Sequence, residues 1–214
     1  QIYVNGKEQY TFKHRIPLEK VSALNINGDV SVNLFGFIQD WSTSSFVTKV
    51  KSKIISLGSS RGECSTVQSE ILQPVQNPSL PYVGPISGGL REGMALYVQG
   101  VVPTNADRFS INFKTGPTDK HDIAFHFNPR MGSKVVMNSL TNGKWGAEES
   151  VSDNPFKKGE DFEMFFVIKS EGYQVQIKGQ QHGMFKHRIP LEKVTTIHIH
   201  GKVTISFLGF VMGM

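Results

Sequence analysis

Residues 108–139 read RFSINFKTGPTDKHDIAFHFNPRMGSKVVMNS. This stretch holds three short runs of β-forming residues, at 108–114, 122–128 and 134–139, separated by turns that contain Gly, Pro or Asp. In the first run Phe109, Ile111 and Phe113 alternate with polar residues, so their side chains share one face of a strand. The pattern predicts strands with one face buried in a core and the other face polar.

Runs of the same kind continue from residue 77 to the end of the chain. They are four to nine residues long, lie between clusters of Gly, Pro, Asn or Asp, and show no sustained helical period. Many short strands at this spacing are typical of a sandwich or barrel. We therefore predict an all-β fold, a two-sheet antiparallel β-sandwich.

Composition and charge exclude several classes of protein. Of the 214 residues, 38% are hydrophobic and 19% charged, which describes a folded chain and not a disordered one. No run of 18 apolar residues exists, so we expect no membrane insertion, and neither end reads as a secretory signal. The single cysteine, Cys64, excludes a disulfide framework and cysteine-based zinc sites. A net charge of +5 is too mild to indicate nucleic acid.

The chain repeats part of itself. Residues 12–21 and 185–194 both read FKHRIPLEKV, and residues 1–37 match residues 174–210 at 17 of 37 positions without a gap. We therefore expect 1–37 to be the closing part of a first domain, 38–76 to be a linker and 77–214 to be a complete second domain. The middle of the predicted linker, 58–66, is small, polar and aperiodic.

The candidate site begins in the run 122–128. A period of two places His126 and Asn128 outward on the same face, and Arg130 follows closely enough to project over that face. Asn138, Trp145 and Glu148 follow in later segments. Any one of them alone is explained by an ordinary polar surface or a core indole. Together they have the composition of a sugar site, since hydroxyls need directional donors and acceptors and a pyranose ring needs a flat aromatic platform.

This part of the chain resembles the galectin carbohydrate-recognition domain. It is similar to the family's signature, in order and spacing, in three segments: His126-Phe127-Asn128-Pro129-Arg130, Val136-Met137-Asn138 and Trp145-Gly146-Ala147-Glu148. The resemblance covers about residues 77–210 and implies a jelly-roll-like sandwich of the galectin and concanavalin type. The whole chain resembles a tandem-repeat galectin that lacks most of its first domain.

The resemblance implies a calcium-independent lectin that binds β-galactosides of the lactose or N-acetyllactosamine type. Three residues would hydrogen-bond the axial 4-hydroxyl, two would bind the 6-hydroxyl, and an indole would stack under the sugar ring. In that order they are His126, Asn128 and Arg130, then Asn138 and Glu148, and finally Trp145. The implied partners are β-galactoside-bearing glycoproteins or glycolipids, and the implied location is cytoplasmic and, after export without a signal peptide, extracellular.

We expect no cofactor, no metal and no enzymatic activity. His198 and His200 share one side of a strand, but the sequence offers no third ligand, so we interpret them as exposed strand histidines. No nucleophile or second carboxylate at glycosidase spacing accompanies His126 and Glu148. We interpret Arg188, in the repeated turn, as structural.

An alternative hypothesis is a galectin-like module for protein association with weak or lost sugar binding. The family commonly has an arginine where this chain has Ser150, which leaves the preference at the second sugar open. Strands of an incomplete first copy would also have unpaired edges, which favour self-association or competition with residues 174–210 for the same place.

Overall fold

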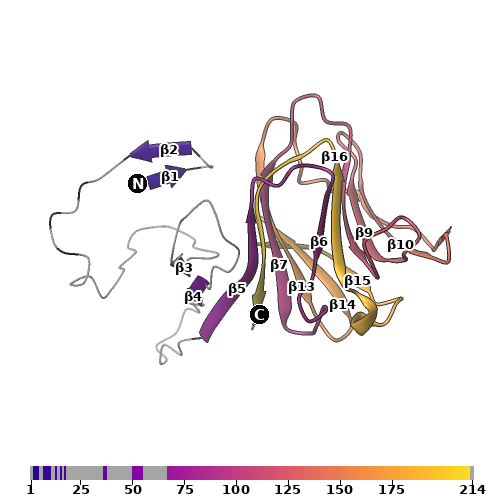
Figure 1. Cartoon of the computed structure of the whole chain (residues 1–214). Helices are drawn as coiled ribbons and strands as arrows, with labels where there is room; N and C mark the ends of the chain where they lie inside the picture. Colours follow the sequence, from indigo (N-terminus) through magenta and orange to yellow (C-terminus); the bar gives the residue numbers. More distant parts are fainter. Residues whose placement is uncertain are drawn as a thin grey trace, which may run out of the picture. The chain divides into compact units, whose positions relative to one another are not determined.

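The β-forming runs of the sequence make two antiparallel sheets within residues 35–214 (Figure 1). The computed structural model describes residues 2–4, 7–10, 13, 15, 17, 36–37, 50–54 and 67–212, and the side chains of 13, 15, 17 and 73–212. The chain divides into two units, Gln1–Leu34 and Phe35–Met214, which we describe separately.

The first sheet carries the candidate site. Its strands are neighbours in the order β11-β10-β9-β8-β16-β6, and β12 also pairs with β10. The bounds are β6 (Tyr82–Pro85), β8 (Phe109–Lys114), β9 (Ile123–Pro129), β10 (Val135–Thr141), β11 (Lys144–Trp145), β12 (Glu149–Val151) and β16 (Thr196–Gly201). The three β-forming runs at 108–114, 122–128 and 134–139 are therefore β8, β9 and β10, side by side in this sheet.

The second sheet has the order β15-β14-β13-β7-β17-β5-β4-β3. Its bounds are β3 (Gly36–Phe37), β4 (Val50–Ile54), β5 (Val67–Gln76), β7 (Met94–Val101), β13 (Asp161–Ile168), β14 (Gly172–Ile177), β15 (Gln180–Lys186) and β17 (Thr204–Met212). One 3₁₀ turn, η2 (Leu191–Lys193), links β15 to β16. The described residues contain no helix with the length and apolarity needed to span a membrane.

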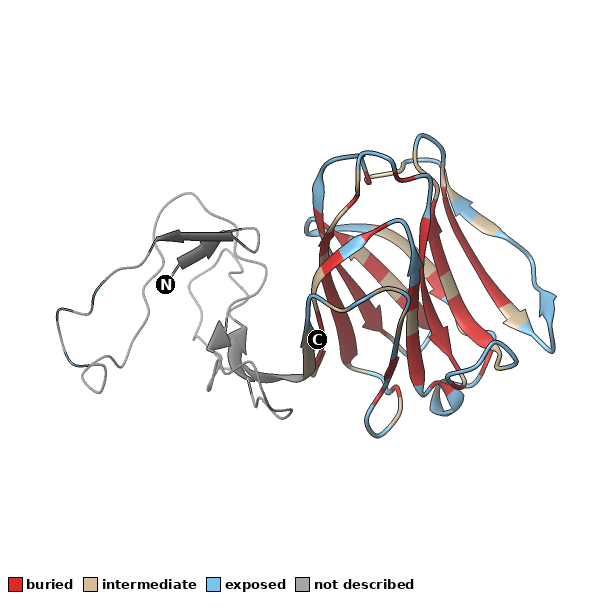
Figure 2. Ribbon diagram, turned by 45° about the horizontal axis from the view of Figure 1, so that its top comes forward, coloured by how far each residue is buried: buried red, intermediate tan, exposed pale blue. Residues whose placement is uncertain are grey.

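The core lies between the two sheets and is rich in aromatic rings. Most strand residues are buried, and the exposed residues lie mainly in the loops and at the ends of strands (Figure 2). Phe125 of the first sheet lies 4.7 Å from Tyr173 and 4.8 Å from Phe185 of the second, measured between ring centroids. Such pairs contribute to stability beyond the area they bury. The predicted all-β sandwich is confirmed.

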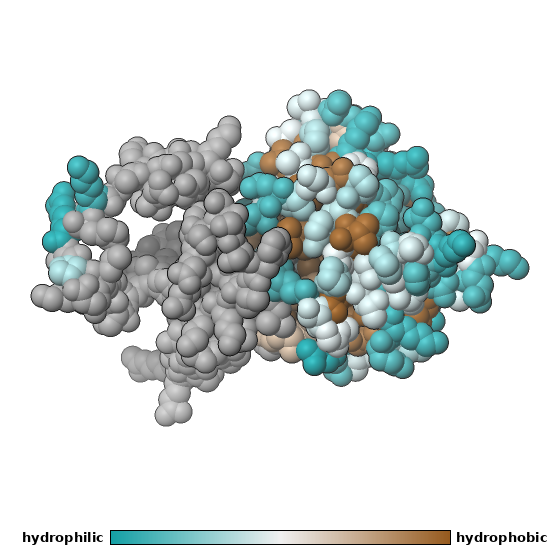
Figure 3. Space-filling model, in the orientation of Figure 1, coloured by the Kyte–Doolittle hydropathy of each residue, from teal (hydrophilic) through white to brown (hydrophobic). Residues whose placement is uncertain are grey.

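Figure 3 shows how apolar residues are distributed over one face of the described residues. On its described part, hydrophobic residues form small separate patches among hydrophilic ones. Single exposed apolar residues are normal on a soluble domain. Among the large apolar side chains in the described part of the chain, Val83 and Trp145 are the exposed ones, at 44% and 53%.

Strands β4 and β5 both fall within the range that we predicted to be a linker, and they pair with each other. Strand β5 is the longer of the two. It pairs with β17 through Gln76↔Phe207 and Leu72↔Phe210 and so extends the second sheet. Its pairing shifts near Gln73, which has a positive φ of 52° and precedes Pro74. A proline and a bulge inside a strand hide it from sequence patterns. The central stretch 58–66, with Cys64, lies outside the described residues.

The first unit contains a hairpin of β1 (Ile2–Val4) and β2 (Lys7–Tyr10). Its pairs are Val4↔Lys7, Tyr3↔Glu8 and Ile2↔Tyr10. Shifted by the 173 residues of the sequence repeat, these positions become Ile177↔Gln180, Gln176↔Gln181 and Val175↔Gly183, which are the pairs of the β14–β15 hairpin. The repeated sequence therefore makes the same hairpin with the same irregularity twice.

Candidate functional site

A row of side chains crosses the first sheet on the face away from the core. The strand register pairs Asn138 with His126, His126 with Asn112, and Asn112 with His198. Residues that pair directly across strands point to the same face. Polar side chains from four neighbouring strands therefore form one row on the same face of the sheet.

His126 is held in one orientation by Asn112. Its Nδ1 atom lies 2.6 Å from Oδ1 of Asn112, and an amide oxygen only accepts, so Nδ1 carries the proton and Nε2 is left as an acceptor. Burial, followed by the charges of His200 and Arg130, lowers the pKa of His126 from 6.5 to about 4. The ring is therefore neutral at neutral pH and presents a lone pair to a ligand.

Asn128 and Arg130 form the next part of the site. The buried amide of Asn128 donates from Nδ2 to the carbonyl of Phe109 at 2.6 Å. Its Oδ1 atom accepts a hydrogen bond of 3.1 Å from Nε of Arg130. The guanidinium is aligned at one edge by this bond, and its side chain is 41% exposed. Arg130 thus has donors available at the surface of the sheet.

Glu148 lies between two cations at the rim. Its Oε1 atom is 2.6 Å from Nζ of Lys134, and its Oε2 atom is 3.9 Å from Nη2 of Arg130. The hydrogen bond from Lys134, and then the charges of Lys134 and Arg130, lower the pKa of Glu148. The carboxylate is therefore ionised at neutral pH and can only accept hydrogen bonds.

Asn138 ties β10 to the loop that follows β11. Its Nδ2 atom donates to the carbonyl of Gly146 at 3.0 Å, and its Oδ1 atom accepts from the Ser139 main-chain N–H at 2.8 Å. Oδ1 also accepts a bond of 3.1 Å from Nη1 of Arg188. The residue is 6% exposed, so only a small part of it is accessible at the surface.

Trp145 stands at the edge of the row. It lies on β11, paired with Leu140, and is 53% exposed. Its ring centroid is 4.9 Å from that of His126, with the planes inclined by 56°. The indole is therefore not a core residue, and its open side supplies a flat apolar platform next to the polar row.

All six residues predicted from the sequence lie together on this side of the first sheet. His126 and Asn128 lie on β9, and Arg130 is the residue that follows it. Asn138 lies on β10 and Trp145 on β11, and Glu148 directly precedes β12. Sequence reasoning missed Asn112 and Lys134, which hold His126 and Glu148, because strand pairing and ion pairing cannot be seen in one sequence. The structural role predicted for Arg188 did not include its hydrogen bond to Asn138.

The pair His198 and His200 differs in part from its prediction. Both lie on β16 with ring centroids 5.0 Å apart, and His200 is exposed while His198 is half-buried. The hydroxyl of Ser110 lies 2.9 Å from Nε2 of His200. Burial is the main cause that lowers the pKa of each ring. The described residues contain no group of three or more His, Cys, Asp or Glu placed to hold a metal ion.

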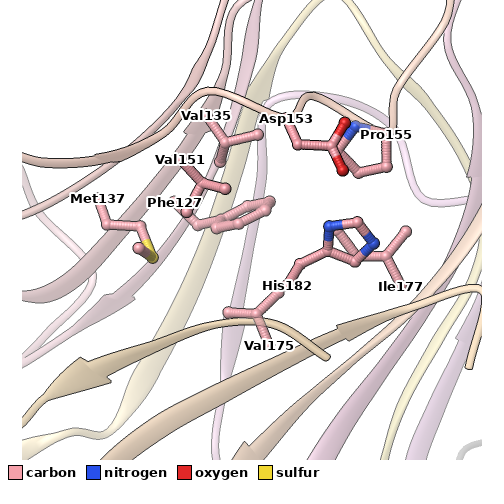
Figure 4. Close-up of a pocket in the computed structure, with 9 residues that line it drawn as sticks. All are labelled: Phe127, Val135, Met137, Val151, Asp153, Pro155, Val175, Ile177 and His182. Carbon is pink, nitrogen blue, oxygen red and sulfur yellow. The ribbon is translucent and has the colours of Figure 1, made fainter. Parts of the chain in front are cut away.

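A small apolar hollow opens between the two sheets, away from the polar row (Figure 4). Its walls are apolar and include Phe127, Met137 and Ile177. Asp153 and His182 are the ionisable side chains that line it. With so few polar groups, this hollow is poorly suited to a ligand made of hydroxyls.

The sequence is similar to known lectins. A sequence model of the galactoside-binding lectin family matches residues 1–37 and 81–210. Galectin-4 of Bos taurus is 46% identical over 143 residues, which are 66% of this chain and 43% of that protein. Galectin-4 of Homo sapiens is 44% identical over the same length, 44% of that protein. The chain thus spans less than half the length of these relatives. Galectin-7 of Homo sapiens is 36% identical over 128 residues, 59% of this chain and 94% of that protein.

Solved structures that resemble this fold are also galectins. A variant of human galectin-16 superimposes with a TM-score of 0.60 at 28% identity and covers 64% of this chain and 98% of its own. The galectin LEC-6 of Caenorhabditis elegans superimposes with a TM-score of 0.58 at 28% identity, covering 64% and 94%.

Proposed function

Because this chain belongs to the galactoside-binding lectin family, the galectins, we propose that it is a calcium-independent lectin for β-galactosides of the lactose or N-acetyllactosamine type. The ligand lies across β9, β10 and β11, on the face away from the core. The observation that carries this proposal is the exposed indole of Trp145 beside the neutral imidazole of His126, 4.9 Å away, with hydrogen-bonding groups on the next strands.

The axial 4-hydroxyl of galactose fits the groups at the centre of the row. Nε2 of His126 can accept a hydrogen bond from this hydroxyl, because the ring proton is on Nδ1, which is bonded to Asn112. Asn128 has a second N–H beyond the one bound to Phe109, and Arg130 has Nη donors. The hydroxyl therefore donates once and accepts twice, which uses its full capacity.

The same groups account for selectivity against glucose. An equatorial 4-hydroxyl points away from His126, Asn128 and Arg130, and leaves their polar atoms desolvated without partners. Each such loss costs about 1–3 kcal/mol. An axial 4-hydroxyl also leaves one face of the ring apolar, and this face stacks on Trp145.

The 6-hydroxyl fits the pair of groups at the rim. Asn138 keeps one N–H beyond the bond to Gly146, and Glu148 accepts through its carboxylate. With a shallow and partly exposed site, a single domain binds in the micromolar to millimolar range, about −4 to −8 kcal/mol. Strong attachment to glycoproteins or glycolipids then requires several sites at once.

The finer organisation belongs to the same proposal. Residues 77–214 form the domain with the site, 1–37 are the closing strands of a sister domain, and 38–76 connect them, with β3, β4 and β5 joined to the sheet of the second domain. None of the six site residues has a counterpart within 1–37, so each chain of this length has one site. The protein acts by binding, without catalysis, and works in the cytoplasm and, after export without a signal peptide, outside the cell.

The direct test is chromatography of the chain on immobilised lactose in buffer with a chelator. We expect retention, and elution by free lactose but not by the same concentration of sucrose. Passage without retention, or retention that free lactose does not reverse, would contradict the proposed function.

A further inference from the structure

The guanidinium of Arg188 joins parts of the protein that are distant in sequence. Nη1 donates to Oδ1 of Asn138 at 3.1 Å and to Oγ of Ser139 at 3.3 Å. Nη2 donates to Oε1 of Glu149 at 2.7 Å. Arg188 lies in the loop after β15, whereas its partners belong to β10 and β12 of the sheet that carries the proposed site. The side chain thus links β10 to β12 next to Asn138.

The position of this guanidinium is fixed on several sides. Its central carbon lies 4.5 Å from the ring centroid of Phe185, and its ion pair with Glu149 leaves the Arg188 side chain 26% exposed. The β10 pairing shifts between Asn138 and Leu140, and a bulge of this kind re-aims neighbouring side chains. A planar fork held by a stacked ring and a carboxylate keeps its direction with little loss of entropy.

The contacts of Asn138 define which of its atoms are left for a ligand. Oδ1 accepts from the main chain of Ser139 and from Arg188, which uses both of its lone pairs. Nδ2 gives one proton to the carbonyl of Gly146. A main-chain N–H only donates and a carbonyl only accepts, so the amide cannot be turned over. One N–H remains, and Asn138 faces the ligand as a donor only.

We propose that Arg188 is a positioning residue that, as the second donor to Oδ1, holds the amide of Asn138 with its free N–H toward the ligand and thereby sets the preference for a hydroxyl at C6 of the sugar. This inference rests on the proposed function. Asn138 offers one donor and the Glu148 carboxylate offers acceptors, so the group between them must accept and donate together, as a hydroxyl does. Without Arg188 the Oδ1 atom keeps its bond from Ser139 but loses its second partner, so the amide can tilt and its free N–H no longer points steadily at the ligand.

The test compares two ligands on two proteins. Methyl β-D-galactopyranoside and its 6-deoxy analogue are titrated, by NMR, into the full chain and into its Arg188→Lys variant. We expect the full chain to prefer the galactoside roughly tenfold, the value of one hydrogen bond to a charged group. The variant reduces this preference to within about twofold, because a lysine cannot reproduce the fork. Its affinity for the 6-deoxy ligand changes by less than about twofold.

Lys186→Met is the matched control, because Lys186 is an exposed cation two residues earlier, at the end of β15. It keeps the full preference. A purely structural role for Arg188 would weaken both ligands by the same factor, and that outcome, or an unchanged preference, overturns the inference. A full chain that binds neither ligand contradicts the proposed function instead.

If the NMR spectrum shows that Arg188→Lys does not fold, the same titrations are made with Glu149→Gln. This variant keeps the shape of the side chain but removes the charge that holds Nη2 at 2.7 Å. We expect its preference for the galactoside to fall to about threefold, consistent with the loss of a partly exposed ion pair. A preference that stays at the value of the full chain overturns the inference.

Discussion

Nδ1 of His126 lies 2.6 Å from Oδ1 of Asn112, so a residue of β8 fixes the tautomer of the histidine at the centre of the proposed site on β9. Asn112 is 1% exposed and has no access to a ligand. The contact defines Nε2 as the acceptor for the sugar 4-hydroxyl, and it links recognition to a residue outside the signature segments.

Asn112→Ala should therefore weaken galactoside binding although it removes no ligand contact. The variant removes the acceptor that keeps the proton on Nδ1, so the ring can carry its proton on Nε2 and lose its acceptor for the 4-hydroxyl. We expect lactose affinity to fall roughly tenfold in isothermal titration calorimetry. Ser110→Ala, on the same strand and facing His200, is the control and should bind as the full chain does. Equal affinities for the full chain and Asn112→Ala would rule out this role.

Trp145→Ala should abolish retention on immobilised lactose while the chain stays folded. The indole is 53% exposed, so its removal changes the free energy of unfolding by less than about 1 kcal/mol. The loss of stacking and of covered apolar surface reduces affinity at least about tenfold. Val83→Ala, the matched exposed apolar residue on β6, should retain lactose binding. If Trp145→Ala were retained as strongly as the full chain, the indole would not be part of the binding site.

Gly146→Ala should disturb the rim of the site. A Cβ atom at this position would lie 2.9 Å from Nη1 of Arg188 and 3.3 Å from Oδ1 of Asn138, closer than such atoms normally approach. We expect the Asn138 amide to shift and lactose affinity to fall about fivefold or more, measured by calorimetry. At Gly183 the added atom meets nothing nearer than the flexible end of Met137 at 3.4 Å, so Gly183→Ala is the control. Identical affinities for the two variants would contradict this steric account.

The stability of the domain should decrease in acid partly because of His126. Its pKa is about 4 in the folded state and 6.5 when exposed, so the unfolded chain binds the proton first as the pH falls. Acidification from pH 6.5 to pH 4 therefore favours unfolding, by roughly 3 kcal/mol for this group. Urea denaturation should show a smaller decrease over that range for His126→Asn than for the full chain. The pKa values of His198 and His200 are also lowered, but these residues are present in both proteins and contribute equally to both pH profiles. Parallel pH profiles would contradict this assignment.

Sequence patterns predicted much of the fold because alternation is local. The alternating residues of 109–113 are enough to define a half-buried strand, and the period of two in 122–128 puts His126 and Asn128 on one face. The packing of the two sheets follows from the number of such strands. The six site residues were identified from three short segments whose order and spacing are themselves local.

What the sequence did not predict depends on partners far along the chain. Asn112 and Lys134 acquire their roles from strand register and from ion pairing, and neither is visible before the strands are placed. The contact of Arg188 with Asn138 spans 50 residues. Strand β5 was missed because its bulge at Gln73 and its Pro74 break the alternation.

The most direct measurement of the central claim uses two disaccharides that differ at one stereocentre. Lactose has an axial 4-hydroxyl on its terminal sugar and cellobiose an equatorial one. Each is titrated into the chain while the indole resonance of Trp145 is followed by NMR. We predict that lactose shifts this resonance with a Kd in the micromolar to millimolar range and that cellobiose binds at least about 100-fold more weakly. Equal affinities, or lactose binding that leaves the Trp145 resonance unmoved, would contradict a galactoside site built on His126, Asn128, Arg130 and Trp145.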